Sequence, residues 1–373
     1  MPFHLRLAWL LVCLAIVSVT GLSSRAQTID AKLALAREDR YIAEEAVEHH
    51  FRGAVLAGMD GKIIFEKAYG PADGEWDVPN SLKSKFRIAS LTKQFTATCV
   101  LLLQERGLLH VQDRVSKYLP DMPAAWKGVT IHRLLTHTSG VPNPDYGSKQ
   151  SKNTDRIGAT PGELVTLVAG QPLDFSPGTK WNYSNTGYML LGMLIEKLSG
   201  QPYADFLKTN IFDPLSMTDS GYDRASKILK DRASGYNLEN GRLTNADFID
   251  MSVPFSAGGI YSTVEDLFRW NEALACPGKL LSAGSLRQMF TEYPEATHEG
   301  QHYGYGIVIS RQKFGRLLYY HGGGVRGFSS VIQRYPKERL CLVVLSNLES
   351  YKPWELADHI AAGIFHLPMP KEH

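Results

Sequence analysis

Four strand-like segments follow one another closely near the end of this 373-residue chain. They span Tyr305 to Ser310, Leu317 to Tyr320, Phe328 to Tyr335 and Leu340 to Ser346. Parallel strands need long crossover connections, and these links are too short to provide them. The segments are therefore predicted to form an antiparallel sheet.

The beginning of the chain carries a second strand pattern. Gly53 to Ala57 and Lys62 to Tyr69 flank the dipeptide Asp60-Gly61, which accepts the positive φ angles of a hairpin turn. Helical patterns dominate elsewhere, and the predicted helices are Ile29 to Phe51, Ser90 to Arg106, Thr186 to Leu198 and Trp354 to Phe365.

These patterns predict an α+β fold, in which an antiparallel sheet flanked by helices is built from both ends of the chain. The sheet region covers about residues 27–89 and 303–373, and a mainly helical region, about 90–302, is inserted between its two parts. The length and the 44% hydrophobic content suit one domain, predicted over residues 27–373.

The first residues have the pattern of a secretory signal peptide. Met1 to Arg6 carry a positive charge, Leu7 to Leu22 are apolar, and Ser24-Arg25-Ala26 precede Gln27. We expect residues 1–26 to be removed and the protein to be exported to the periplasm or secreted. An uncleaved membrane anchor is the alternative, although the apolar run is shorter than the ~20 residues of a spanning helix.

Composition excludes some partners. The formal charge of +2 gives no sequence-wide field for nucleic acid, so no nucleic-acid partner is predicted. No cofactor and no metal are predicted. The odd number of cysteines after the signal (Cys99, Cys276 and Cys341) implies no disulfide scaffold.

The first chemical motif is Ser90-Leu91-Thr92-Lys93, at the beginning of a predicted helix. A three-residue offset on a helix places the serine hydroxyl and the lysine amine on one face, where they share a proton. A serine hydroxyl needs such a base to act as a nucleophile. The alternative is an ordinary helix-capping serine.

The second motif, Tyr183-Ser184-Asn185, lies on a turn before an apolar helix. With a reference pKa near 10, the Tyr183 phenol needs a neighbouring cation such as Lys93 to act as a base. Asn185 would orient the lysine or a substrate amide. In the alternative interpretation Tyr183 only packs and Asn185 only caps the helix.

The third motif is His321-Gly322-Gly323-Gly324, placed at the end of the strand Leu317 to Tyr320. Clustered glycines let a backbone approach a ligand closely and leave its amides free to bind an oxyanion. A glycine-rich hairpin with a surface histidine is the alternative.

In order and spacing, the three motifs resemble the serine β-lactamase and penicillin-binding superfamily, specifically its class C and esterase-like branch. The resemblance covers nearly all of the mature chain. Further similar stretches are Phe86 to Ala89, Leu134 to Gly140, Gly258-Gly259, Tyr261 to Thr263 and Gly327 to Ser329.

This resemblance implies a serine hydrolase of the β-lactamase/transpeptidase-like fold in which Ser90 is acylated. Lys93 and Tyr183 would exchange protons with Ser90 and the leaving group, and the amides of Ser90 and Gly324 would form the oxyanion hole. The implied substrate-binding residues are Asn185, His321, Gly322, Gly323 and Arg326.

His321 departs from the family pattern, because penicillin-recognising members usually carry a lysine there. With a reference pKa near 6.5, a histidine is largely neutral at pH 7. This shifts the expected substrate from β-lactams or D-alanyl peptides toward other esters and amides, unless Arg326 restores the charge. The expected partners are small-molecule ester, amide or β-lactam-like substrates, or a peptide derived from the cell wall.

The sequence opposes three other classes of protein. His298-Glu299-Gly300-Gln301-His302 matches a zinc-peptidase pattern, but its glycines and Pro294 oppose the helix that such a site needs. An α/β-hydrolase is opposed by the absence of a glycine-x-serine-x-glycine elbow. A non-catalytic binding module is opposed by the joint presence of Ser90, Lys93, Tyr183 and Asn185.

Overall fold

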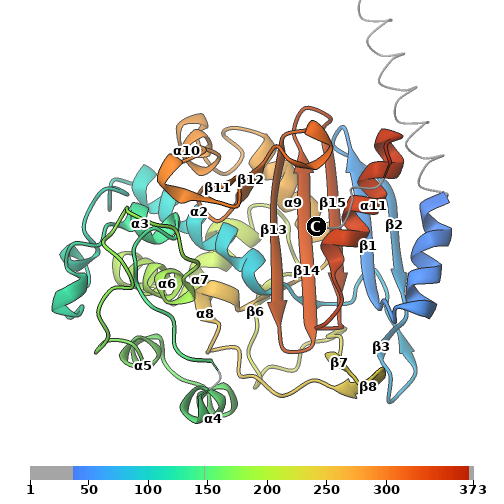
Figure 1. Cartoon of the computed structure of the whole chain (residues 1–373), viewed down its shortest axis with the longest axis horizontal. Helices are drawn as coiled ribbons and strands as arrows, with labels where there is room; N and C mark the ends of the chain where they lie inside the picture. The colour runs from blue at the N-terminus through green and yellow to red at the C-terminus, as the bar shows by residue number, and fades with distance from the viewer. Residues whose placement is uncertain (1–36, 147, 369–373) are drawn as a thin grey trace, which may run out of the picture.

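The computed structural model describes residues 37–146 and 148–368. Its main feature is an eight-stranded sheet in the order β10-β11-β12-β13-β14-β15-β1-β2, in which neighbours run antiparallel (Figure 1). The strands are β1 (Gly53–Met59), β2 (Lys62–Tyr69), β10 (Thr297–His298), β11 (Gln301–Tyr303), β12 (Val308–Ser310), β13 (Leu318–Val325), β14 (Phe328–Tyr335) and β15 (Leu340–Ser346).

Pairing between β1 and β15 joins the two ends of the chain, with Gly53 opposite Ser346. The prediction that both ends build one antiparallel sheet is therefore confirmed. The β1–β2 hairpin turns at Asp60 and Gly61, whose φ angles of 53° and 72° are those that a two-residue hairpin loop requires.

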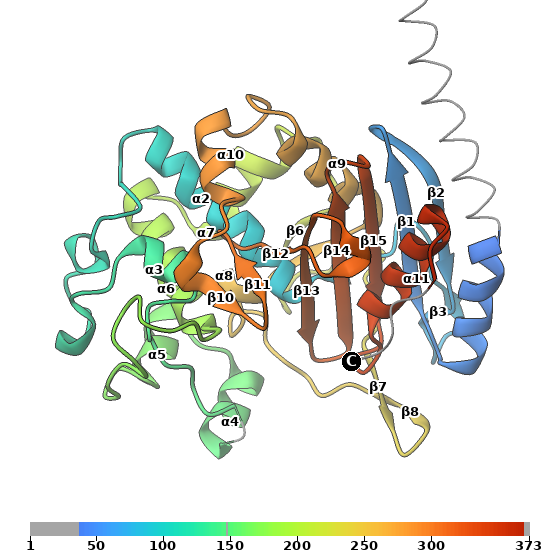
Figure 2. The same ribbon diagram turned by 45° about the horizontal axis from the view of Figure 1, so that its top comes forward.

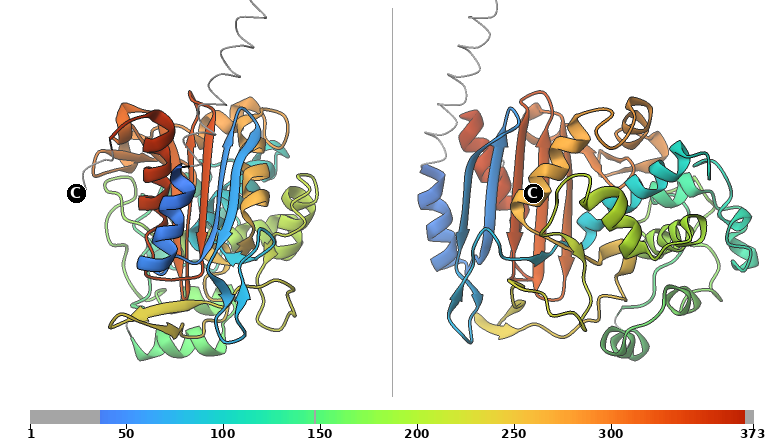
Figure 3. Two further views of the ribbon diagram at one scale, coloured as in Figure 1. Left: turned by 90° about the vertical axis from the view of Figure 1, so that its right-hand side faces the viewer. Right: turned by 180° about the vertical axis from the view of Figure 1, so that it is seen from behind.

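Helices cover both faces of this sheet (Figure 3). Residues 37–48 are helical and lie with α11 (Pro353–Phe365) on one face, where Ile42 and Leu356 join a core with Val55 and Val344. On the other face α9 (Val264–Ala275) packs against β1 and β15. A sheet buried on both faces explains why β1 and β15 are apolar throughout their length.

A mainly helical region stands beside the sheet. Its helices are α2 (Thr92–Glu105), α3 (Ile131–Leu135), α4 (Lys149–Ile157), α5 (Pro161–Thr166), α6 (Asn185–Ser199), α7 (Tyr203–Leu207), α8 (Phe255–Gly258) and α10 (Ala283–Met289). Short strands accompany them: β3 (Pro71–Asp73) with β4 (Val78–Pro79), β5 (Phe86–Arg87) with β9 (Ile260–Ser262) and β6 (Gly221–Tyr222), and β7 (Tyr236–Glu239) with β8 (Arg242–Asn245).

Helix α2 forms the centre of this region and is buried from Thr92 to Leu103. A helix that is covered on all sides needs no polar face, and α2 packs against both α6 and α8. Figure 2 shows β10, β11 and β12 lying over the junction between the sheet and these helices.

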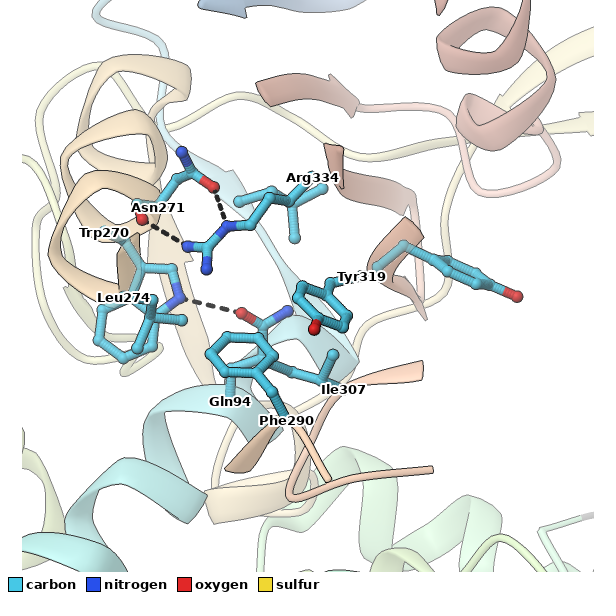
Figure 4. Close-up of a pocket in the computed structure, with 10 residues that line it drawn as sticks. Gln94, Trp270, Asn271, Leu274, Phe290, Ile307, Tyr319 and Arg334 are labelled. Atoms are coloured by element: carbon cyan, nitrogen blue, oxygen red, sulfur yellow. Dashed lines mark hydrogen bonds between the residues drawn. The ribbon is translucent and has the colours of Figure 1, made fainter. Parts of the chain in front are cut away.

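Side-chain contacts hold α2 against α9 and the sheet. Trp270 Nε1 donates to Gln94 Oε1 at 3.0 Å, and Arg334 on β14 donates through Nε to Asn271 Oδ1 at 2.6 Å (Figure 4). These residues surround a cavity of about 10 Å³, which has room for about one water molecule. The contacts fix the helix that carries Lys93.

Some elements differ from those predicted. The strand expected to end at Tyr320 continues through the glycines to Val325, because β14 pairs with it along its whole length. The strand expected from Tyr305 begins only at Val308, since Gly306 turns with a φ of 73°. Helix α9 and strands β10 and β11 come from residues before 303, yet they pack on the sheet or belong to it.

The predicted signal peptide, residues 1–26, lies outside the described residues. Within residues 37–146 and 148–368, no helix combines the length and the hydropathy needed to cross a bilayer.

Candidate active site

Ser90 lies on a single 3-10 turn, Ala89–Leu91, between β5 and α2. The incoming chain is tied to β9, because the Ile88 amide donates to the Ile260 carbonyl at 3.0 Å. Ala89 then takes a φ of 47°, a strained value for a residue with a side chain. This turn aims Ser90 out of the strand direction and starts α2 immediately after it.

Lys93 follows one helical turn later and points to Ser90. Its Nζ lies 3.1 Å from Ser90 Oγ, 2.9 Å from Asn185 Oδ1 and 2.8 Å from the Ala257 carbonyl oxygen. The lysine is fully buried. The structure thus brings Asn185, predicted at the entrance of a later helix, together with Ser90 and Lys93, predicted on one face of an earlier helix.

Burial lowers the pKa of Lys93 well below its ordinary value of 10.5, because an ammonium ion loses its hydration there. In this structure Lys93 Nζ donates to the Ser90 hydroxyl as well as to the oxygens of Asn185 and Ala257. Once it loses a proton, the amine has two N–H groups for those two oxygens and a lone pair for the Ser90 hydroxyl, and the lowered pKa favours this form.

Tyr183 completes the cluster from the other side. The Lys93 Nζ lies 4.7 Å from the centre of its ring. Burial raises the pKa of the phenol above its ordinary value, and a hydrogen bond with Ser90 opposes this only in part. Burial therefore keeps the Tyr183 phenol protonated at neutral pH, and Lys93 is not among the groups that shift its pKa.

Asn185 is the first residue of α6, and Ser184 caps that helix. The Ser184 hydroxyl accepts from the Gly187 amide at 3.0 Å, which frees Asn185 from capping. The Asn185 amide donates instead to the Tyr146 hydroxyl at 3.1 Å while its oxygen binds Lys93. The interpretation of Asn185 as a mere cap is therefore excluded.

The glycines of β13 bring this strand against the nucleophile. A Cβ atom on Gly323 would lie 2.4 Å from the Ile88 carbonyl oxygen and 3.0 Å from the Ser90 nitrogen, so only glycine fits there. A Cβ atom on Gly324 would meet nothing within 4 Å, and Gly324 lines the cavity beside Ser90.

His321 has partners inside the protein. It is buried; its Nδ1 donates to the Gly322 carbonyl at 2.6 Å, so the neutral ring's Nε2 accepts from the Tyr303 hydroxyl at 2.9 Å. Burial, with Lys93 nearby, lowers the pKa of His321 to about 4. Neither His321 nor Gly322 or Gly323 is among the residues that line the cavity beside Ser90.

That cavity, here called the Ser90 cavity, has a volume of about 420 Å³. Apolar side chains form much of its wall, including Met189, Ile249 and Val253. Arg326 does enter it, and its guanidinium lies 3.6 Å from the carboxylate of Asp155 on α4. Of the described residues that line the Ser90 cavity, Arg326 is the one cation.

Several neighbours of the cluster have no signal in the sequence. Ala257 contributes only a backbone oxygen, and Tyr146 and Asp155 come from a segment without a motif. His137 lies in a stretch that the family resemblance did include. Its buried ring accepts from the Ser184 amide at 3.1 Å and packs against the Tyr183 ring in a tilted arrangement, with 4.3 Å between the ring centroids.

The segment with the zinc-peptidase pattern forms the β10–β11 hairpin. Glu299 and Gly300 turn with φ angles of 49° and 73°, so the helix that the pattern requires is absent. His298 stacks on Trp181 at 4.7 Å.

An antiparallel sheet beside a helical region, with serine, lysine and tyrosine clustered at their junction, defines a serine hydrolase of the β-lactamase fold. The comparison with known families agrees. A sequence model described as Beta-lactamase matches residues 34–363, and the chain belongs to that family.

Individual relatives are similar over most of the chain. Penicillin-binding protein 4* of Bacillus subtilis is 34% identical over 337 residues, which cover 85% of this chain and 73% of that protein. The octameric penicillin-binding protein homologue from Pyrococcus abyssi has a TM-score of 0.79 at 28% identity, covering 89% of this chain and 78% of the other. The D-stereospecific amidohydrolase from Streptomyces sp. has a TM-score of 0.73 at 26% identity, and the match covers 90% of this chain and 98% of the other.

Proposed function

We propose that this protein is an exported hydrolase that cleaves an ester or an amide through a covalent acyl-enzyme on Ser90. The observation that carries the proposal is the contact of 3.1 Å between Lys93 Nζ and Ser90 Oγ at a buried lysine. A desolvated amine beside a hydroxyl is a general base for that hydroxyl.

In the first step, Ser90 Oγ attacks the substrate carbonyl carbon and its proton passes to the Lys93 lone pair. The carbonyl oxygen gains a negative charge, which the backbone amides of Ser90 and Gly324 would stabilise. Gly323 supports this role, because its lack of a side chain lets β13 approach the Ser90 nitrogen.

In the second step, the tetrahedral intermediate collapses and the leaving group takes a proton. Tyr183 is the proposed donor, because burial keeps its phenol protonated. The proton that Lys93 took from Ser90 then restores the Tyr183 phenol. A water molecule then attacks the acyl group, and the same residues return the proton to Ser90.

The charges around the cavity favour substrates without a carboxylate. His321 is neutral, and the charge of Arg326 is balanced by Asp155. An ester or a neutral amide therefore fits better than a β-lactam, which carries a carboxylate.

A second candidate is hydrolysis of amides or peptides of D-amino acids. The similarity in fold to the D-stereospecific amidohydrolase from Streptomyces sp. favours it. The chemistry at Ser90 would be the same, and only the acyl group would differ.

Mass spectrometry of the intact protein after treatment with a fluorophosphonate tests the nucleophile. The wild-type protein should gain one adduct, and Ser90→Ala should gain none. An equal adduct on both proteins would refute the assignment. Substrate preference is tested separately, since a short p-nitrophenyl ester should be cleaved faster than a chromogenic cephalosporin.

A further inference from the structure

A second cavity borders the Ser90 cavity at Arg326. It has a volume of about 430 Å³ and lies between the β7–β8 hairpin and the turn that joins β13 to β14. We call it the Arg232 cavity, and polar residues form most of its wall: Arg87, Arg232, Ser234, Asn245, Asp247 and Arg326. Within the described part of the chain, Arg326 is the only lining residue that the two cavities share.

Arg326 thus forms the partition between the two spaces. It belongs to a tight turn, in which the next residue, Gly327, has a φ of 80° and donates its amide to Glu349 Oε2 at 2.9 Å. The ion pair with Asp155 on α4 holds the guanidinium, with 3.6 Å between the charged groups.

The charges of the Arg232 cavity are balanced within the protein. Asp223 is almost fully buried and accepts from Arg87 Nε at 2.9 Å and from Arg232 Nη2 at 2.6 Å. Asp155 balances Arg326, and the carboxylates of Glu75 and Asp247 also line the wall. The cavity therefore has no cationic excess that would select an anion.

The two cavities differ in chemistry. The Ser90 cavity offers apolar walls to an acyl group, whereas the Arg232 cavity has guanidinium, amide, hydroxyl and carboxylate groups in its wall. Some of these groups pair with one another, since Asn245 Nδ2 donates to Glu75 Oε1 at 2.8 Å and Ser234 Oγ donates to Asp73 Oδ2 at 3.0 Å. An uncharged amide group supplies one donor and one acceptor and matches such a mixed wall without a charge.

We propose that the Arg232 cavity is a second substrate subsite, which continues the Ser90 cavity past Arg326 and binds an uncharged, amide-type extension of the acyl group. The proposal rests on the proposed hydrolase function. It assigns the substrate to acyl donors that combine an apolar part near Ser90 with a peptide-like polar part beyond it.

Two p-nitrophenyl esters test this subsite: a butyryl ester, which fills only the Ser90 cavity, and the same ester extended by two glycinamide units. The wild-type protein should have a kcat/KM at least about tenfold higher for the extended ester. Asn245→Trp fills the cavity and should remove this preference while the butyryl ester reacts within about twofold of wild type. Arg242→Trp, on the same hairpin but outside the cavity wall, should keep it.

An equal kcat/KM for both esters in the wild-type protein, or an unchanged preference in Asn245→Trp, would overturn the subsite. Binding of the extended carboxamide to Ser90→Ala, followed by calorimetry, separates this result from the hydrolase proposal. In the Ser90→Ala protein, adding Asn245→Trp should weaken binding of the carboxamide at least about tenfold. This result does not depend on whether the wild-type protein hydrolyses either ester. Equal affinities with and without Asn245→Trp would overturn the subsite but leave the hydrolase proposal in place.

Discussion

At the scale of the residue, burial decides what each catalytic side chain does. Lys93 and Tyr183 are two bases of similar reference pKa, and desolvation moves them in opposite directions. The amine becomes easier to deprotonate and the phenol harder. These opposite shifts support the proposed roles of Lys93 as proton acceptor and Tyr183 as proton donor.

The pH dependence of acylation should follow from the lowered pKa of Lys93. The rate should rise with pH as the amine loses its proton, with the rise complete well below pH 10.5. Lys93→Arg keeps the charge but has no lone pair, so kcat/KM should fall by roughly 10² to 10⁴. Rate profiles against pH for both proteins check this, and a near-native rate in Lys93→Arg would contradict the role of base.

Removal of Tyr183 tests the donor. Tyr183→Phe should lower kcat for an alkyl ester by roughly 10² to 10⁴, because the alkoxide then leaves without a proton. The loss of kcat should be smaller for a p-nitrophenyl ester, because its leaving group is a weak base and departs without taking a proton. Equal losses of kcat with the two esters would argue against proton donation.

His321 should make the fold sensitive to acid. Its pKa of about 4 lies below the value of 6.5 expected for the unfolded chain, so between these values only the unfolded chain binds the proton. Protonation of His321 in the unfolded chain does not affect stability above about pH 6.5. As the pH falls toward 4, it lowers the free energy of unfolding by about 3 kcal/mol in total. His321→Gln has no titrating group at this position. Its free energy of unfolding in urea should therefore fall less between pH 7 and pH 4 than that of the wild-type protein. An identical loss in both proteins would exclude His321 as the cause.

At the scale of the element, the position of β13 depends on small residues in contact with the Ser90 turn. Gly322 and Gly323 are neighbours on this strand, but they differ in surroundings. A Cβ atom on Gly323 would lie 2.4 Å from the Ile88 carbonyl, while one on Gly322 would have the Ser330 oxygen as its nearest neighbour, at 3.7 Å.

Gly323→Ala should therefore push β13 away from Ser90, lowering stability by about 1–3 kcal/mol and reducing kcat. Gly322→Ala is the matched control, since its new methyl group makes an ordinary contact, and it should retain both. Denaturant unfolding and ester kinetics on the two variants check this. Similar losses in both variants would show that close approach to Ser90 is not what Gly323 provides.

At the scale of the whole molecule, the site exists only where the sheet and the helical region meet. Ser90 and Lys93 come from the turn into α2, Tyr183 and Asn185 from the entrance of α6, and Gly324 from a strand near the end of the chain. Asp155 on α4 and Arg326 after β13 join the two sides of the cavity by an ion pair.

The proposed export depends on the signal-peptide pattern of residues 1–26. When residues 1–373 are expressed in a bacterial host, N-terminal sequencing of the secreted or periplasmic protein should begin at Gln27. Ala26→Arg should block cleavage, because the site requires a small residue. Recovery of wild-type protein with residues 1–26 still attached would contradict the predicted signal peptide.

Local features of this protein could be predicted from its sequence: the antiparallel pairing of the closely spaced C-terminal strands, the Asp60-Gly61 hairpin and the shared face of Ser90 and Lys93. These features depend on periodicity, loop length and helical spacing, which short stretches encode. Three other properties became visible only in the folded chain: the direction in which each pKa shifts, the contact of His321 with Tyr303, and the ion pair of Arg326 with Asp155 between two cavities. They depend on burial and on contacts between segments that are distant in the sequence, so no short stretch can predict them.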